Sequence, residues 1–157
     1  MNHLAITEEA FELLEPTIRI LLHSKAKRED MHIVVMNPTK KPWESSFDEA
    51  ILFETSLTDR SGWENPYDVV AREKARQSWK DGYDNVRKHL LAPATLAIGD
   101  LAFYGSFEYG GVVVAASGVE SWYDALISGW MAVTIHQLAQ RDYSLFKQDH
   151  PTDRFLS

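Results

Sequence analysis

Apolar residues recur at helical spacing near the start of the chain and would share one face of a helix: Phe11, Leu14, Ile18, Leu21 and Leu22. The pattern predicts a helix that begins near Thr7, whose hydroxyl can cap the first turn. Pro16 lies inside the pattern and has no backbone N–H, so we expect a kink or a break near Glu15.

Two short apolar runs follow, and both predict strands. Residues 31–36 are apolar and β-branched, as is typical of a buried strand, and Asn37-Pro38 ends this run. A second strand is expected over about residues 50–57, where side chains partly alternate between apolar and polar.

The middle of the chain predicts two helices. Asn65 and Pro66 suit the start of the first, which is expected to run to about Lys80 and to stop at Gly82. A shorter helix is expected over residues 84–91. Both helices are rich in basic side chains: Arg72, Lys74, Arg76, Lys80, Arg87 and Lys88. We interpret this basic region as solvated helix faces rather than as a phosphate or carboxylate site.

The last third of the chain predicts a hairpin followed by a long helix. A third strand is expected from Leu96 to Phe103, with a bend at Gly99 or Gly105. Gly110-Gly111 suits a two-residue turn because both positions tolerate positive φ. Residues 112–116 are apolar throughout and predict a central strand, and a helix is expected from Ser121 to about Tyr143.

Composition and charge narrow the class of protein. The 157 residues predict one domain over residues 1–143 with a polar C-terminal tail over 144–157, and the order of elements predicts an α+β fold. A net charge of −7 argues against nucleic acid as a general partner. There is no cysteine, no signal-peptide pattern at the start and no apolar run long enough to span a membrane, so we expect a cytoplasmic protein without a membrane partner.

Two segments resemble a known family. Residues 71–78 resemble its A-x-x-K-A-x-x-A helix, and Val112 to Gly118, followed six residues later by Asp124, resemble its closing V-S-G-x-x-x-x-x-D segment. The family is the small GlcG-like or HbpS-like haem-degrading (haem-binding) domain, which also occurs at the C-terminus of some cobalamin adenosyltransferases. The resemblance covers about residues 47–140.

This resemblance implies a profilin-like fold, in which helices flank an antiparallel sheet. It also implies homo-oligomers and a small ligand, which is haem in some members of the family. The ligand is then expected between the sheet and the helices, near Lys74, Tyr109, Ser117 and Asp124. The identity of the ligand stays open, with haem as one candidate cofactor.

Two other functions remain open from the residues themselves. An interaction module without a bound cofactor would use an exposed sheet and the aromatic start of the last helix, Trp122-Tyr123. An enzyme would use Glu108 or Asp124 as acid or base, provided that the two carboxyls converge in a pocket. The six histidines show no metal-binding spacing, so no metal site is expected, and His136 is interpreted as an ordinary histidine rather than as an axial haem ligand.

Overall fold

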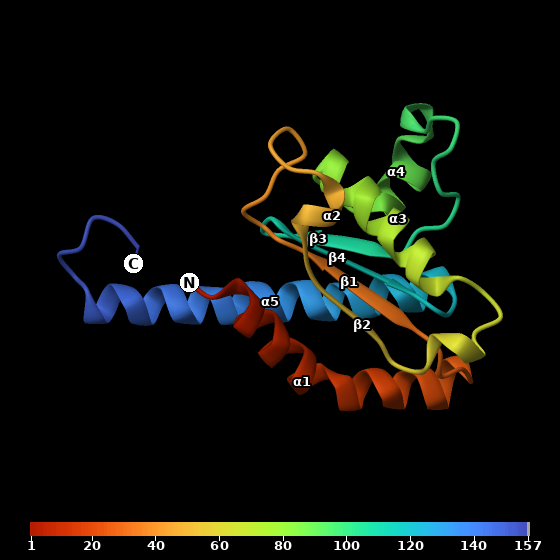
Figure 1. The fold of residues 1–157 in the computed structure, drawn as a ribbon, viewed down its shortest axis with the longest axis horizontal. Helices are drawn as coiled ribbons and strands as arrows, with labels where there is room; N and C mark the ends of the chain where they lie inside the picture. The colour runs from red at the N-terminus through yellow and green to blue at the C-terminus, as the bar shows by residue number, and fades with distance from the viewer. Residues whose placement is uncertain (157) are drawn as a thin grey trace.

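The computed structural model describes residues 1–156 and shows three layers, a sheet between two groups of helices (Figure 1). The four strands are antiparallel and lie in the order β2-β1-β4-β3. Their bounds are His32–Met36 for β1, Ile51–Ser56 for β2, Ser106–Tyr109 for β3 and Val112–Ser117 for β4. The predicted α+β class, with helices flanking an antiparallel sheet, is confirmed.

Helices α1 (His3–Leu21) and α5 (Ser121–Asp149) pack on one face of the sheet, and α3 (Tyr67–Asp81) packs on the other. The short helices α2 (Phe47–Ala50) and α4 (Asn85–Leu91) lie on the α3 side (Figure 1). No helix within residues 1–156 is long and apolar enough to cross a membrane.

Alternating side chains of the two central strands fill two separate apolar layers, because successive residues of a strand point to opposite faces. The layer beneath α1 and α5 takes one set from the sheet: Ile33, Val35, Val112, Val114 and Ala116. The layer beneath α3 takes the intervening set: Val34, Met36, Val113 and Ala115. This two-sided burial explains why both strands are buried throughout and almost entirely apolar, and β4 is central as predicted.

The first helix differs from the prediction in where it starts. Asn2 caps it, since its side-chain oxygen accepts a hydrogen bond from the Ala5 amide at 3.1 Å. Thr7 lies inside the helix, where its hydroxyl donates to the His3 carbonyl. The helix continues through Pro16 without a break and changes direction about midway along its length (Figure 1).

The third strand was expected too early in the chain. Residues 96–105 form an irregular loop with a turn at Ile98-Gly99, and β3 begins at Ser106. Gly99 and Gly105 adopt positive φ angles of 95° and 151°, which interrupt an extended strand. Ile98, whose apolar side chain suggested burial, is fully exposed.

The hairpin and the last helix agree with the prediction more closely. Gly110 and Gly111 have φ angles of 57° and 87°, as a two-residue hairpin turn requires. The last helix begins at Ser121 but continues past Tyr143 to Asp149, so residues 144–149 of the expected tail are helical. Its C-terminal half extends beyond the sheet (Figure 1).

The start of α4 covers the outer edge of β3. The Ser106 amide donates a hydrogen bond to the side-chain oxygen of Asn85 at 3.1 Å. The next amide that faces the same way, that of Glu108, donates to the carboxylate of Asp84. Side chains therefore satisfy the outward N–H groups of this edge strand.

Candidate functional site

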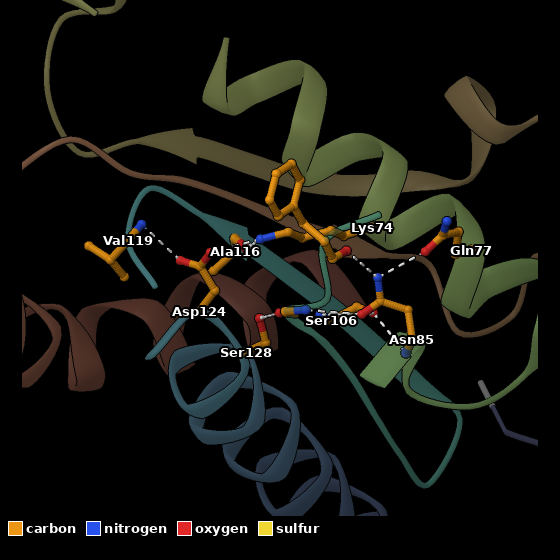
Figure 2. A network of polar contacts seen from close by, with 10 residues as sticks. Lys74, Gln77, Asn85, Ser106, Ala116, Val119, Asp124 and Ser128 are labelled. Carbon is orange, nitrogen blue, oxygen red and sulfur yellow. Dashed lines mark hydrogen bonds and ion pairs between the residues drawn. The ribbon is translucent and has the colours of Figure 1, made fainter. Parts of the chain in front are cut away.

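A buried ion pair joins the two helical layers at one end of the sheet. The Lys74 ammonium of α3 lies 2.7 Å from the Asp124 carboxylate of α5, and each residue is only 1% exposed (Figure 2). Lys74 also donates a hydrogen bond to the Ala116 carbonyl at 3.0 Å, and the second carboxylate oxygen of Asp124 accepts one from the Val119 amide. Both charges are paired and hydrogen-bonded, as burial requires.

The strand register explains why Lys74 reaches Ala116. The last pair of the β3–β4 ladder is Ser106 with Ala115, so the Ala116 carbonyl lies one residue beyond the ladder. The residue that would continue the ladder, Gly105, donates its amide to Asn85 instead. The Lys74 ammonium thus occupies the place of a missing strand partner.

Gly105 leaves the space that the ion pair needs. A Cβ atom at this position would lie 2.7 Å from the Lys74 ammonium and 2.8 Å from the Asp124 Cβ. Its φ angle of 151° also disfavours any other residue. The backbone therefore passes so close to the ion pair that only glycine, which has no side chain, fits at this position.

The Asn85 side chain fixes the path of Gly105. Its oxygen accepts hydrogen bonds from the amides of Gly105 and Ser106, and its nitrogen donates to Gln77 and to the Phe103 carbonyl (Figure 2). On the other side, the Ser128 hydroxyl of α5 donates to the Gly105 carbonyl at 2.6 Å. Side chains of α3, α4 and α5 therefore hold this turn in place.

Burial shifts the pKa values of the pair in opposite directions. Loss of hydration raises the pKa of the Asp124 carboxyl to about 6, although Lys74 and the Val119 amide act against this shift. The same loss of hydration lowers the pKa of Lys74 despite its charged partner. A carboxyl that titrates near neutral pH can take up or release a proton under ordinary conditions.

A cavity of about 310 Å³ opens onto this ion pair. Lys74, Ser117 and Asp124, three of the four residues expected near a ligand, line its wall. The remaining lining comes from the end of β4, the start of α5, the start of α3 and two loops: Arg28, Asn65, Pro66, Tyr67, Val70, Phe103, Gly118, Val119 and Ser121. The volume suits a small organic molecule.

The structure places Tyr109 elsewhere, which corrects its assignment to this group. β3 runs antiparallel to β4 and pairs Tyr109 with Val112, at the opposite end of β4 from Ser117. At 3.4 Å per residue this separation along the strand is about 17 Å. Tyr109 instead packs against His136, with ring centroids 4.9 Å apart.

Glu108 and Asp124 do not form the carboxylate pair that the enzyme hypothesis needs. Glu108 pairs with Val113 in the ladder, and its carboxylate accepts a hydrogen bond from the Gly111 amide at 2.7 Å. It is therefore a turn residue near the hairpin. Asp124 has Lys74 as its partner instead.

The histidines do not gather at the cavity. His136 lines a separate, largely apolar cavity of about 200 Å³ together with His3. Within residues 1–156 no group of three or more His, Asp and Glu side chains is arranged to hold a metal ion.

His32 belongs to a second polar cluster on the α3 face of the sheet. Its ring nitrogens contact the Ser56 hydroxyl at 2.8 Å and the Glu54 carboxylate at 2.7 Å, and Arg72 donates two hydrogen bonds to Glu54. Burial lowers the pKa of His32, which favours the neutral ring. The cluster connects β1, β2 and α3.

Several residues of the site carried no signal in the sequence. Arg28 follows the end of the first helix and reaches the cavity only through the fold, and Asn85 forms its contacts with residues about twenty positions away. Ser121 was predicted as the start of a helix, which it is, and its place in the cavity wall follows only from the fold.

Comparison with known proteins supports the fold and leaves the activity open. No family model and no curated protein matches the chain. A solved structure, described as the crystal structure of Ybr137w protein, is similar to it with a TM-score of 0.53 and 14% sequence identity. The similarity covers 82% of this chain and 77% of that chain. At this sequence identity the structural similarity supports the mixed α+β fold, and no function is inferred from it.

Replacing Lys74 with methionine is expected to lower the free energy of unfolding by about 3–5 kcal/mol, because the Asp124 charge is left buried without a partner. The double variant Lys74→Met/Asp124→Leu should lose less than the single variant, since no buried charge remains. Urea denaturation measures both. As a control, Arg141→Met removes an exposed partner of Glu9 and should cost far less. A double variant less stable than the single would contradict the buried-charge account.

The Asp124 carboxyl should titrate near pH 6, as followed by the chemical shift of its side-chain carbon in NMR. The folded protein then binds this proton more tightly than the unfolded chain does. The contribution of Asp124 to the free energy of unfolding should therefore fall as pH rises from about 4 to about 6, and stay constant above. Asp59 is the comparison, because hydrogen bonds from Ser61 lower its pKa. A midpoint for Asp124 at or below that of Asp59 would refute the shift.

Proposed function

We propose that this chain is a small-ligand-binding domain that acts as a homo-oligomer, with its ligand in the cavity above the Lys74–Asp124 pair. The observation that carries the proposal is a buried pair of opposite charges on the wall of a cavity. Pairs of this kind contribute little to stability compared with apolar residues of the same size, so their presence beside a cavity supports a role in binding.

The walls of the cavity combine the two kinds of surface that ligand sites use. Val70, Phe103 and Pro66 offer apolar surface, and Lys74, Ser117 and Asp124 offer polar groups at the base. Lys74 and Asp124 are held in position by each other, by the Ala116 carbonyl and by the Val119 amide.

Haem fits neither the Lys74 cavity nor the cavity that His136 lines. The lining of the Lys74 cavity contains no histidine and no methionine, and Tyr67 is its one residue of a type that ligates haem iron. His136 lines the other cavity, whose volume of about 200 Å³ is below that of ordinary ligand sites. The proposed ligand is therefore smaller than haem.

Filling the cavity should abolish binding. Val70 lines it and is half-buried on α3, so Val70→Trp is expected to occupy the space, whereas the neighbouring Val69 is exposed and outside it. Fragments that bind the natural protein in saturation-transfer NMR should lose their signal with Val70→Trp and keep it with Val69→Trp. Haemin serves as the large comparison compound, and its Soret band should be the same with all three proteins. Equal fragment binding by both variants would contradict the proposal.

An apolar surface on α5 supports the oligomer. We call the exposed side chains of Trp122, Leu126 and Val133, with the half-buried Trp130, the α5 face. No charged residue occurs from Ala125 to Gln140, although the outer side of a surface helix is ordinarily charged. Leu14 of α1 and Phe107 of β3 extend this surface onto the two elements beside α5. Two copies with a net charge of −7 each repel, and an uncharged face gives the least repulsive contact between them.

Leu126→Glu is expected to convert the oligomer to a monomer, because association would bury a carboxylate against apolar side chains. Leu145→Glu is the matched control, since Leu145 is also exposed but lies near the far end of α5. Light scattering coupled to size-exclusion chromatography gives the mass of each. A natural protein that is already monomeric, or equal masses for the two variants, would refute this part of the proposal.

A further inference from the structure

The hydrogen-bonding groups left over at the base of the cavity are donors. Lys74 has three N–H donors, and Asp124 and the Ala116 carbonyl take two of them. Both carboxylate oxygens of Asp124 already accept hydrogen bonds. Ser117 is only 4% exposed, lines the cavity, and forms no side-chain hydrogen bond with residues 1–156. This hydroxyl, on a buried residue in the cavity wall, is free to bond a group that the ligand supplies.

The first turn of α5 adds further donors on the same side. This helix has 29 residues, and no side chain caps its N-terminus. Ser121, its first residue, lines the cavity. The first N–H groups of a helix have no partner within it, and they favour a negatively charged ligand. The uncapped start of α5 and the unpartnered Ser117 hydroxyl are independent observations, and both call for an acceptor.

Arg28 completes the set from the rim. It is exposed, lines the cavity, and forms no ion pair with an acid of residues 1–156. Its planar guanidinium can hold the two oxygens of a carboxylate side by side. The path to this rim is a broader groove that shares Arg28, Asn65, Tyr67 and Gly118 with the cavity.

The charges of the lining set the charge of the ligand. Arg28 and Lys74 contribute two positive charges and Asp124 one negative charge, which leaves one positive charge. Glu120, the acid that repels Asp124, is not part of the lining, and Glu29, Asp30 and Glu64 line the groove outside. This arrangement suits a single negative charge and disfavours a phosphate dianion.

We propose that the ligand is a small organic monocarboxylate, with its carboxylate bound by Arg28, the Ser117 hydroxyl, the spare N–H of Lys74 and the start of α5. Its apolar part packs against Val70 and Phe103. The inference rests on the proposed function and specifies the class of ligand. It also revises the interpretation of the basic helix surface, because Lys74 belongs to an anion site rather than to a solvated helix face.

The test compares three compounds of one shape and different charge: benzoate, benzamide and benzylamine. Titrations followed by the amide signals of Gly118 and Val119 give the dissociation constants. We expect the dissociation constant of benzoate to be lower than that of benzamide by about tenfold or more. Arg28→Gln and Ser117→Ala should each weaken benzoate severalfold and leave benzamide unchanged. The control Lys147→Gln removes an exposed positive charge at the far end of α5 and should change neither.

The outcomes separate this inference from the proposed function. Benzamide or benzylamine binding as tightly as benzoate would refute the carboxylate and leave a ligand-binding cavity in place. Inorganic phosphate that shifts the same signals at lower concentration than benzoate would also refute it. If none of the four compounds shifts Gly118 or Val119, both the inference and the proposed function fail.

Discussion

The contact between the Lys74 ammonium and the Asp124 carboxylate sets the geometry at one end of this molecule. The two residues lie fifty positions apart, on helices that cover opposite faces of the sheet, and they meet just before β3 begins. The surrounding backbone is adapted to them. Gly105 crosses over the pair without a side chain, and Asn85 and Ser128 hold that crossing in place. The cavity is the space that remains beside these fixed groups.

The local patterns of the sequence were sufficient for most of the fold. Helical and strand periodicity depend on neighbours in the chain, and the Gly110-Gly111 turn needs only its own φ angles. The prediction of a strand at residues 96–103 was wrong. Most of the apolar side chains there are exposed, and whether a side chain is buried depends on packing against residues far away in the sequence. Of the two outcomes expected at Pro16, a kink or a break, the helix shows a change of direction without a break, since an α-helix can bend at a proline and keep the remaining hydrogen bonds.

The candidate site shows the same division between local and distant causes. Lys74, Ser117 and Asp124 were found because short motifs contain them, and they line one cavity. Tyr109 was expected beside them, but the antiparallel register places it opposite Val112, at the other end of β4 from Ser117. Arg28, Asn85 and Gly105 could not be assigned, since each acts through residues from another part of the chain.

The covering of β3 by the start of α4 has a consequence for how this protein behaves among other chains. An exposed edge strand presents unpaired amides, and these can template intermolecular β-sheet and aggregation. Here Asp84 and Asn85 occupy the outward amides of Glu108 and Ser106, so a strand from another molecule finds no free donors at these positions. The hairpin is protected by two side chains instead of by an additional strand. These two side chains thereby block the amide donors through which a further strand would extend the sheet at β3.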